Sequence, residues 1–293
     1  MSQVRVAAPA KINLTLEVVG KRSDGYHDLA SILVAVNLED EITLDEAEEV
    51  SLECDVPGLS GPDNLALRAA ERLRAETGHS GGVRVRLAKK IPQAAGLGGG
   101  SSDAAAVLIG LSRLWNTGMS AQDLTPIAAE LGSDVPFFLY GGTAMIQGRG
   151  EIVRPLPAAD LRYALIVTPD IHLQNKTAAM FGMLSGGGLD RGALTRKLEA
   201  RIRGGGDVPA QFLYNRFDAE ADRAYPGLAR YRETLASMGA TEIHLCGAGP
   251  SLFTFVSRRE VGSTLQLLLA HRYGWRSHLV SPTPPVPWPG GSG

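Results

Sequence analysis

The sequence predicts an α+β protein of two domains, because two groups of strands and helices are separated by a proline-containing junction. Residues 1–157 mix apolar strands with amphipathic helices, and the pattern starts again after Pro155–Leu156–Pro157. In residues 158–281 the expected order is strand, helix, strand, strand, helix, strand, which is typical of a ferredoxin-like split unit. Residues 282–293 are rich in proline and glycine and offer little material for a core, so we expect a disordered tail.

In the first domain, strands are predicted where apolar residues cluster or alternate. Val4–Ala8 and Ile12–Val19 are apolar, and Val83–Leu87 alternates apolar residues with arginine, as in a strand with one solvated face. A helix is expected between its cap Asn64 and a stop at Gly78. Another is expected between the cap Ser120 and a stop at Gly132.

In the second domain the same signals give a complete set of elements. The expected strands are Tyr163–Val167, Glu242–Cys246, Leu252–Val256 and Ser277–Val280, and the expected helices are Gly227–Met238 and Val261–His271.

The overall composition argues against nucleic acid or a membrane as a partner. There are 29 basic and 31 acidic residues, whereas surfaces that bind nucleic acid or anionic membranes are basic. No run of about 18 apolar residues is present. Cys54 and Cys246 are too few for a disulfide framework, and no leader-like segment opens the chain, so we expect a cytoplasmic protein. The six histidines show no metal-ligand spacing, and we predict no metal site made by the protein itself.

A glycine-rich loop is the most informative segment. It comprises Pro92, Gln93, Ala94, Ala95, Gly96, Leu97, Gly98, Gly99, Gly100, Ser101 and Ser102, and we call it the phosphate loop. Glycines let the backbone fold closely around a polyphosphate, with amide N–H groups turned inward. A helix is expected to begin at Ser101–Ser102–Asp103, and its N-terminus favours an anion. Its stripe of Ala104, Val107, Leu108, Leu111 and Leu114 predicts a buried face.

We therefore predict that the phosphate loop binds a polyphosphate, together with any magnesium ion that the phosphates carry. A plain glycine turn followed by a serine helix cap is the alternative. Two other phosphate-binding designs do not fit. A P-loop needs Lys-Ser or Lys-Thr after its last glycine, whereas Ser101 follows Gly100 directly. A dinucleotide fingerprint needs an acidic residue about twenty positions on, and Met119–Gln122 is a loop and a cap instead.

Several motifs, in order along the chain, resemble those of a known kinase superfamily. Pro9–Leu14, the phosphate loop and Gly247–Ser251 together resemble the three motifs of the GHMP kinases. More closely, Ser23–Leu29, Gly96–Ala105 and Gly132–Phe138 resemble the 4-diphosphocytidyl-2-C-methyl-D-erythritol kinases. The resemblance implies the two-domain GHMP kinase fold. It also implies ATP-dependent phosphorylation of the 2-hydroxyl of that cytidyl substrate, in the non-mevalonate route to isoprenoid precursors.

The resemblance implies catalytic roles for Lys11 and Asp134. In the family, the aspartate at the position of Asp134 takes the proton from the substrate hydroxyl, and the lysine at the position of Lys11 stands beside it. Such a lysine polarises the hydroxyl, keeps the aspartate ionised and offsets charge on the γ-phosphate. A helix cap for Asp134 and a solvated strand position for Lys11 are the alternatives.

The resemblance also implies a substrate site. Tyr26 and His27 match residues that hold the cytosine and its sugar, although a Tyr–His pair can also simply close a hairpin. Asn13 and Phe181 are further candidates, but residues 169–177 before Phe181 depart from the family pattern. We also assign Asn64 to the ATP site, and Gly247 and Gly249 to the acceptor region through close backbone approach.

Two other functions stay open. A kinase for homoserine, mevalonate or a sugar has no nucleobase to hold, and Tyr26–His27 argues against it. A catalytically silent ligand sensor on the same fold is expected to lack Lys11 or Asp134, and both are present. We expect small-molecule substrates, a magnesium ion that arrives with the nucleotide because no carboxylate cage is visible, and a monomer or homodimer.

Overall fold

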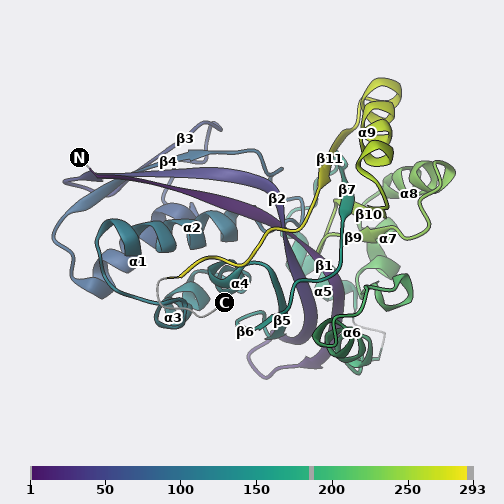
Figure 1. Cartoon of the computed structure of the whole chain (residues 1–293), viewed down its shortest axis with the longest axis horizontal. Helices are drawn as coiled ribbons and strands as arrows, with labels where there is room; N and C mark the ends of the chain where they lie inside the picture. Colours follow the sequence, from purple (N-terminus) through teal and green to yellow (C-terminus); the bar gives the residue numbers. More distant parts are fainter. Residues whose placement is uncertain (1, 185–187, 289–293) are drawn as a thin grey trace.

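The computed structural model describes residues 2–184 and 188–288, which are organised by two sheets. Figure 1 shows the long strands β1 and β2 running from the N-terminus toward the second sheet, with helices α1 to α4 beside them. The seven-stranded sheet contains β1 (Gln3–Lys21), β2 (His27–Ala47), β3 (Ser51–Cys54), β4 (Gly82–Ala88), β5 (Thr143–Gly148), β6 (Ile152–Leu156) and β8 (Tyr214–Asn215). Two of its pairings are parallel and the others antiparallel, which confirms the predicted mixed sheet.

Strand β1 joins the two strands predicted at its ends into one. Its pairing with β2 shifts register between Pro9 and Ala10 and again between Asn13 and Thr15. Such bulges bend a strand, and Pro9 fits one because proline has no N–H to donate to the ladder. Two separate strands, Val4–Ala8 and Ile12–Val19, were predicted here, whereas the chain bends and continues as one strand.

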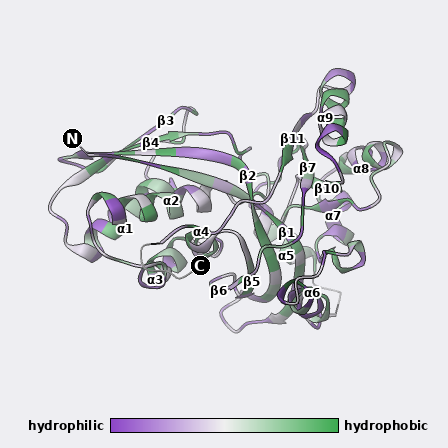
Figure 2. Cartoon of the chain, in the orientation of Figure 1, coloured by the Kyte–Doolittle hydropathy of each residue, from purple (hydrophilic) through white to green (hydrophobic). Residues whose placement is uncertain are grey.

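The first domain has four helices within the described residues: α1 (Leu65–Thr77), α2 (Gly99–Leu114), α3 (Ala121–Leu131) and α4 (Val135–Tyr140). The caps Asn64 and Ser120 and the stop Gly78 lie where they were predicted. Helix α2 begins at Gly99, two residues before the predicted start, because Gly98 adopts the left-handed conformation of its N-cap. The predicted stripe is buried except for half-buried Leu114, and Figure 2 shows the apolar colouring of α2.

The second sheet confirms the ferredoxin-like prediction. Its strands are β7 (Tyr163–Thr168), β9 (His244–Leu245), β10 (Leu252–Val256) and β11 (Arg276–Val280), and its helices are α8 (Leu228–Ser237) and α9 (Arg259–Tyr273). The strands lie in the order β11, β7, β10, β9 and pair antiparallel throughout. A shared apolar core joins the two sheets, with Ile12 and Leu14 of β1 in the same buried cluster as Ile166 of β7 and Phe253 of β10.

A long insertion between β7 and α8 returns to the first sheet. It contains α5 (Lys176–Met183), α6 (Ala193–Arg203), a 3₁₀ turn (Ala210–Phe212), β8, a second 3₁₀ turn (Asp218–Glu220) and α7 (Ala221–Ala224). Strand β8 pairs with β1, and the backbone N–H of Thr195 in α6 donates to Glu17 of β1. The division of the chain at residue 157 stays a prediction, and α6 and β8 do not follow it.

The expectation of a disordered tail is wrong for residues 282–288. Thr283 N donates to Ala35 O at 2.9 Å, Val286 N to Tyr140 O at 2.8 Å, and the indole of Trp288 to Leu139 O at 2.8 Å. Proline-rich composition does not prevent order here, because the segment binds the end of α4 and the edge of β2 through individual hydrogen bonds. Residues 289–293, for which disorder was also predicted, lie outside the described part of the chain.

Candidate active site

Strand β1 carries Lys11 and Asn13 into the interior. The Lys11 side chain is almost fully buried, and its Nζ donates to Asn13 Oδ1 at 2.7 Å. Asn13 Nδ2 donates in turn to Ser31 Oγ at 3.0 Å, which fixes the amide from the neighbouring strand β2. The backbone N–H of Lys11 donates to Leu97 O at 3.0 Å, so this residue is joined directly to the phosphate loop. The alternative of a solvated lysine on a strand is wrong.

The phosphate loop lies between β4 and α2, as predicted, and its shape requires glycine. Gly96 and Gly98 have φ values of 84° and 76°, in the left-handed region. A Cβ on Gly96 would lie 1.9 Å from Cys246 O, and one on Gly98 would lie 2.8 Å from Phe138 Cζ. These two positions therefore exclude a side chain both by conformation and by space.

The third motif completes this junction. A Cβ on Gly247 would lie 2.8 Å from Lys11 Nζ and 3.1 Å from Gly96 O, and Ser251 N donates to Ala95 O at 3.2 Å. Three segments that are far apart in the sequence thus meet around the Lys11 ammonium. We call residues 247–251 the Gly247–Ser251 loop. Gly249 contacts Tyr225 and Leu245 rather than Lys11, so its part in the acceptor site stays a prediction.

Asn215 supports the third motif, although the sequence suggested no role for it. Its Nδ2 donates to Leu245 O at 3.0 Å and to Gly247 O at 2.8 Å, while its Oδ1 accepts from Phe217 N. The side chain is buried and forms a bridge between β8 and the Gly247–Ser251 loop. A buried asparagine needs such partners. The available sequence signal was that Asn215 matches an asparagine of the resembled family, although Arg216 beside it does not.

Asp134 stands immediately before α4 and is half-buried. Asp134 occupies the N-cap position of that helix, but its side chain makes no capping hydrogen bond, so the alternative role is contradicted only for the side chain. Pro136 in the first turn helps to fix the direction of the helix without needing a backbone donor. The role of the Asp134 carboxylate in catalysis stays a prediction.

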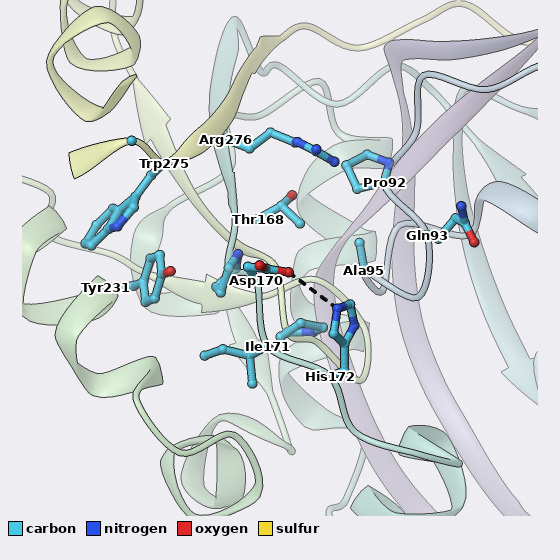
Figure 3. A pocket seen from close by; sticks show the side chains of 13 residues that line it. Pro92, Gln93, Ala95, Thr168, Asp170, Ile171, His172, Tyr231, Trp275 and Arg276 are labelled. Carbon is cyan, nitrogen blue, oxygen red and sulfur yellow. Dashed lines mark ion pairs between the residues drawn. The ribbon is translucent and has the colours of Figure 1, made fainter. Parts of the chain in front are cut away.

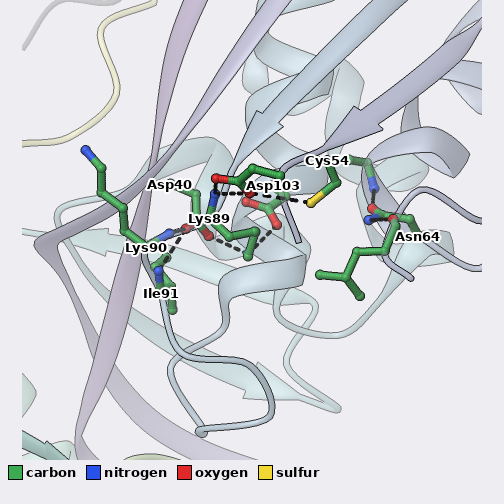
Figure 4. A network of polar contacts seen from close by, with 10 residues as sticks. Asp40, Cys54, Asn64, Lys89, Lys90, Ile91 and Asp103 are labelled. Atoms are coloured by element: carbon green, nitrogen blue, oxygen red, sulfur yellow. Dashed lines mark hydrogen bonds and ion pairs between the residues drawn. The ribbon is translucent and has the colours of Figure 1, made fainter. Parts of the chain in front are cut away.

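A buried ionic network lies directly beside the phosphate loop, and the sequence analysis missed it (Figure 4). Lys89 Nζ donates to Asp40 at 2.5 Å and to Asp103 at 2.7 Å. Asp40 also accepts from the backbone N–H groups of Lys90 and Ile91, which lead into the loop, while Asp103 belongs to the helix that follows it. The network therefore fastens both ends of the loop. Burial, opposed by Lys89 and reinforced by Asp40, raises the pKa of Asp103 to about 7.

The loop also provides a polar atom suited to a ligand. The hydroxyl of Ser102 is buried and has no hydrogen-bond partner within residues 2–184 and 188–288. A buried hydroxyl without a partner is costly, so the site fits a phosphate oxygen or a magnesium ion held with it. Asn64, by contrast, uses its side chain to accept from Ala66 N and to donate to Leu59 O, so its contact with ATP stays a prediction.

The predicted base-binding residues come together from two distant segments. The His27 and Phe181 rings stack with centroids 4.8 Å apart and planes 10° from parallel. Phe217 packs edge-on against Phe181 at 5.0 Å. Tyr26 is 52% exposed, and the Arg149 guanidinium lies 4.9 Å from its ring centroid. Phe181 thus lies against His27 despite the irregular sequence before it, and the contact of both rings with the substrate stays a prediction.

A cavity of about 480 Å³ lies beside the phosphate loop (Figure 3). It is bounded by Pro92 and Gln93 of the loop and by Thr168, His172 and Trp275 of the second domain. Neither Lys11 nor Asp134 lines it. The cavity is therefore separate from the junction around Lys11. Within the described ranges, no helix is long and apolar enough to span a bilayer, and no three side chains of the types His, Cys, Asp or Glu gather around a metal position.

Comparison with known proteins identifies the family. A model of the GHMP kinases N terminal domain matches residues 64–142. The 4-diphosphocytidyl-2-C-methyl-D-erythritol kinase of Dehalococcoides mccartyi is 39% identical over 280 residues, which cover 95% of this chain and 98% of that protein. The chain belongs to this kinase family. The kinase of the same name from Symbiobacterium thermophilum is 42% identical to this chain over 267 residues. The match covers 89% of this chain and 94% of that protein.

The kinase fold is shared with a solved structure. The crystal structure of a 4-(cytidine 5'-diphospho)-2C-methyl-D-erythritol kinase matches this kinase with a TM-score of 0.79 and 31% identity, and the match covers 94% of this chain and 98% of that chain. The resemblance that rested on motifs is thereby confirmed over the full length of the fold.

Proposed function

We propose that this kinase transfers the γ-phosphoryl group of ATP to the 2-hydroxyl of 4-diphosphocytidyl-2-C-methyl-D-erythritol, a step of the non-mevalonate route to isoprenoid precursors. The observation that carries the proposal is the convergence of the three motifs around the Lys11 ammonium, in a chain of this kinase family. The stacked pair of His27 and Phe181 supports a cytidyl acceptor over alcohols that lack a nucleobase.

The phosphate loop binds the nucleotide mainly through its backbone. The left-handed residues Gly96 and Gly98 bring amide N–H groups inward, and the N-terminus of α2 adds its own unpaired N–H groups. Ser102 adds its hydroxyl to a phosphate oxygen or to magnesium. The Ser102 hydroxyl would help to hold a magnesium ion brought in by the nucleotide, and such an ion would neutralise phosphate charge.

Lys11 and Asp134 act on the acceptor hydroxyl. Phosphoryl transfer depends mainly on positioning and charge, so Asp134 orients the hydroxyl and accepts its proton as the bond to phosphorus forms. The Lys11 ammonium stabilises the negative charge that develops on the transferred group. Asn13 holds that ammonium at 2.7 Å and thus fixes its direction.

The acceptor is held at its far end by aromatic side chains. The His27–Phe181 pair offers a planar surface for cytosine, and Tyr26 closes the hairpin beside it. This arrangement places base recognition on both domains, so the acceptor spans the interface between the two sheets. The kinase acts in the cytoplasm as a monomer or homodimer under this proposal.

An ADP-release assay tests the proposal. Purified protein with Mg-ATP is offered 4-diphosphocytidyl-2-C-methyl-D-erythritol, homoserine, mevalonate or galactose in parallel. Turnover with the cytidyl substrate alone supports the proposal. Turnover with another alcohol keeps the kinase chemistry but contradicts the base-binding site, and nucleotide binding without turnover on any acceptor favours a ligand sensor.

A further inference from the structure

Lys176 is the first residue of α5 and belongs to none of the three motifs. Its Nζ donates to Ala94 O at 2.8 Å and to Gly249 O at 2.8 Å. Ala94 lies in the phosphate loop, and Gly249 lies in the Gly247–Ser251 loop. A single ammonium from the inserted segment between β7 and α8 therefore joins the two loops that meet around Lys11.

The two carbonyls that Lys176 contacts belong to backbone in unusual conformations. Ala94 has φ 51°, one of three non-glycine residues with positive φ in the described chain, and Gly249 has φ 78°. A positive φ is energetically unfavourable for a residue with a Cβ, and such strain persists only when neighbouring groups maintain it. A charge-assisted hydrogen bond to the Ala94 carbonyl is a strong interaction of this kind.

Lys176 is also set among charged groups of the reaction site. Burial, and then the nearby Lys11 ammonium, lower its pKa to about 8, while Asp134 and Cys246 act in the opposite direction. These groups face it from β1, from the residue before α4 and from the residue after β9. Burial raises the pKa of the Cys246 thiol to about 12, so this group stays neutral near pH 8.

Given the proposed binding of ATP by the phosphate loop, we propose that Lys176 is a positioning residue for phosphoryl transfer. Its ammonium holds the phosphate loop against the Gly247–Ser251 loop, and this contact sets the shape in which the loop amides meet the nucleotide. Lys176 acts through the backbone of Ala94 and Gly249, and its positive charge adds to that of Lys11 beside the phosphates.

The role has a consequence for pH. Lys176 is charged below about pH 8 and loses its proton above it. Bound phosphates favour the charged form, so nucleotide binding takes up a proton when the free protein has lost it. Affinity for the nucleotide therefore falls as pH rises through 8, by about 10-fold between pH 7 and pH 9.

Nucleotide binding without turnover tests this role. The full-length protein is titrated calorimetrically with the magnesium complex of the β,γ-imido analogue of ATP, at pH 7 and pH 9. The variants are Lys176→Met, which removes the ammonium, and Lys176→Arg, which keeps a cation that does not titrate in this range. Lys197→Met, an exposed lysine of α6, is the matched control for loss of one positive charge. Thermal unfolding of each variant shows that it is folded.

We expect Lys176→Met to bind the analogue about 10- to 100-fold more weakly at pH 7, the size of charge-assisted hydrogen bonds. Lys176→Arg should bind within about fivefold of the wild type at pH 7 and lose the decline toward pH 9, because arginine stays charged. Lys197→Met should match the wild type at both pH values. If Lys176→Met binds within about twofold of the wild type, or if Lys176→Arg keeps the full pH dependence, the inference is overturned. A wild type that binds no nucleotide overturns the proposed function itself, which separates the two failures.

Discussion

The two ends of the proposed substrate site are built in different ways. At the phosphate end, we propose recognition by backbone, and the loop is fixed at both ends by the buried network of Asp40, Lys89 and Asp103. At the base end, we propose recognition by side chains of β2 and α5, with Tyr26 half exposed beside them.

This difference follows from what each end must bind. A polyphosphate is the same in every ATP-dependent kinase, and rigid amide groups suit it without any specific side chain. Among the acceptors considered, only the cytidyl substrate carries a nucleobase, and aromatic rings provide stacking area for this flat group. Changes at the phosphate end should therefore affect ATP, and changes at the base end should affect the acceptor.

The largest expected effect is on kcat, and it concerns Asp134, which we place between the phosphate end and the base end. Asp134→Asn keeps the size of the side chain but removes the proton acceptor, so kcat should fall by about 10²–10⁴-fold. Affinity for the ATP analogue should change little, since the loop is intact. Steady-state kinetics and calorimetry check this together. A folded variant with near-normal kcat would remove Asp134 from the chemistry.

Gly96→Ala should damage the phosphate end selectively. The added Cβ would lie 1.9 Å from Cys246 O in a conformation of positive φ, so the loop must distort. Such strain predicts an affinity for ATP about 10- to 100-fold lower, with the KM for the acceptor less affected. Gly100→Ala is the matched comparison, because its Cβ would come no closer than 3.9 Å to Leu65. Equal losses in the two variants would contradict the steric account.

Phe181→Ala should damage the base end. Stacking on an aromatic ring contributes about 1–3 kcal/mol per base, which corresponds to a KM for the cytidyl acceptor about 5- to 150-fold higher. The KM for ATP should stay within about twofold of the wild type. Initial rates with each substrate varied in turn check this. An unchanged acceptor KM would mean that cytosine binds elsewhere.

The smallest expected effect is on stability, and it concerns residues 282–288, which belong to neither end of the proposed site. Trp288→Ala removes a ring that packs against the apolar core between the first sheet and helices α1 to α4. It also removes the hydrogen bond to Leu139 O, so the free energy of unfolding should fall by about 1–2 kcal/mol. Thermal unfolding should show a Tm lower by a few degrees while kcat is unchanged. Trp288→Phe keeps the ring and should lose less. No change in Tm would show that residues 282–288 contribute nothing to stability.

The sequence predicted several parts of the fold because residues close together in the chain determine them. The helix caps Asn64 and Ser120 and the left-handed glycines of the phosphate loop are signals within a few residues of the features they control. The antiparallel second sheet followed from the order of its elements. These features do not depend on knowing the rest of the fold.

The sequence did not predict features that depend on partners far away in the chain. Lys89 meets Asp40 from a strand 49 positions earlier, and Lys176 meets Ala94 across 82 positions. The tail looked disordered because its order comes from hydrogen bonds to Ala35 and Tyr140, which no local pattern reveals. Lys176 stood in the segment that departs from the family pattern, so motif matching also passed over it.

A crystal structure of the kinase with the magnesium complex of the β,γ-imido ATP analogue and 4-diphosphocytidyl-2-C-methyl-D-erythritol tests the central claim most directly. The account predicts the γ-phosphate against the backbone of Gly96 to Ser102, the acceptor 2-hydroxyl within hydrogen-bond reach of Asp134, and the cytosine stacked on the His27–Phe181 pair. Cytosine in the cavity lined by Pro92 and Trp275, or an acceptor hydroxyl facing away from Asp134, would contradict it.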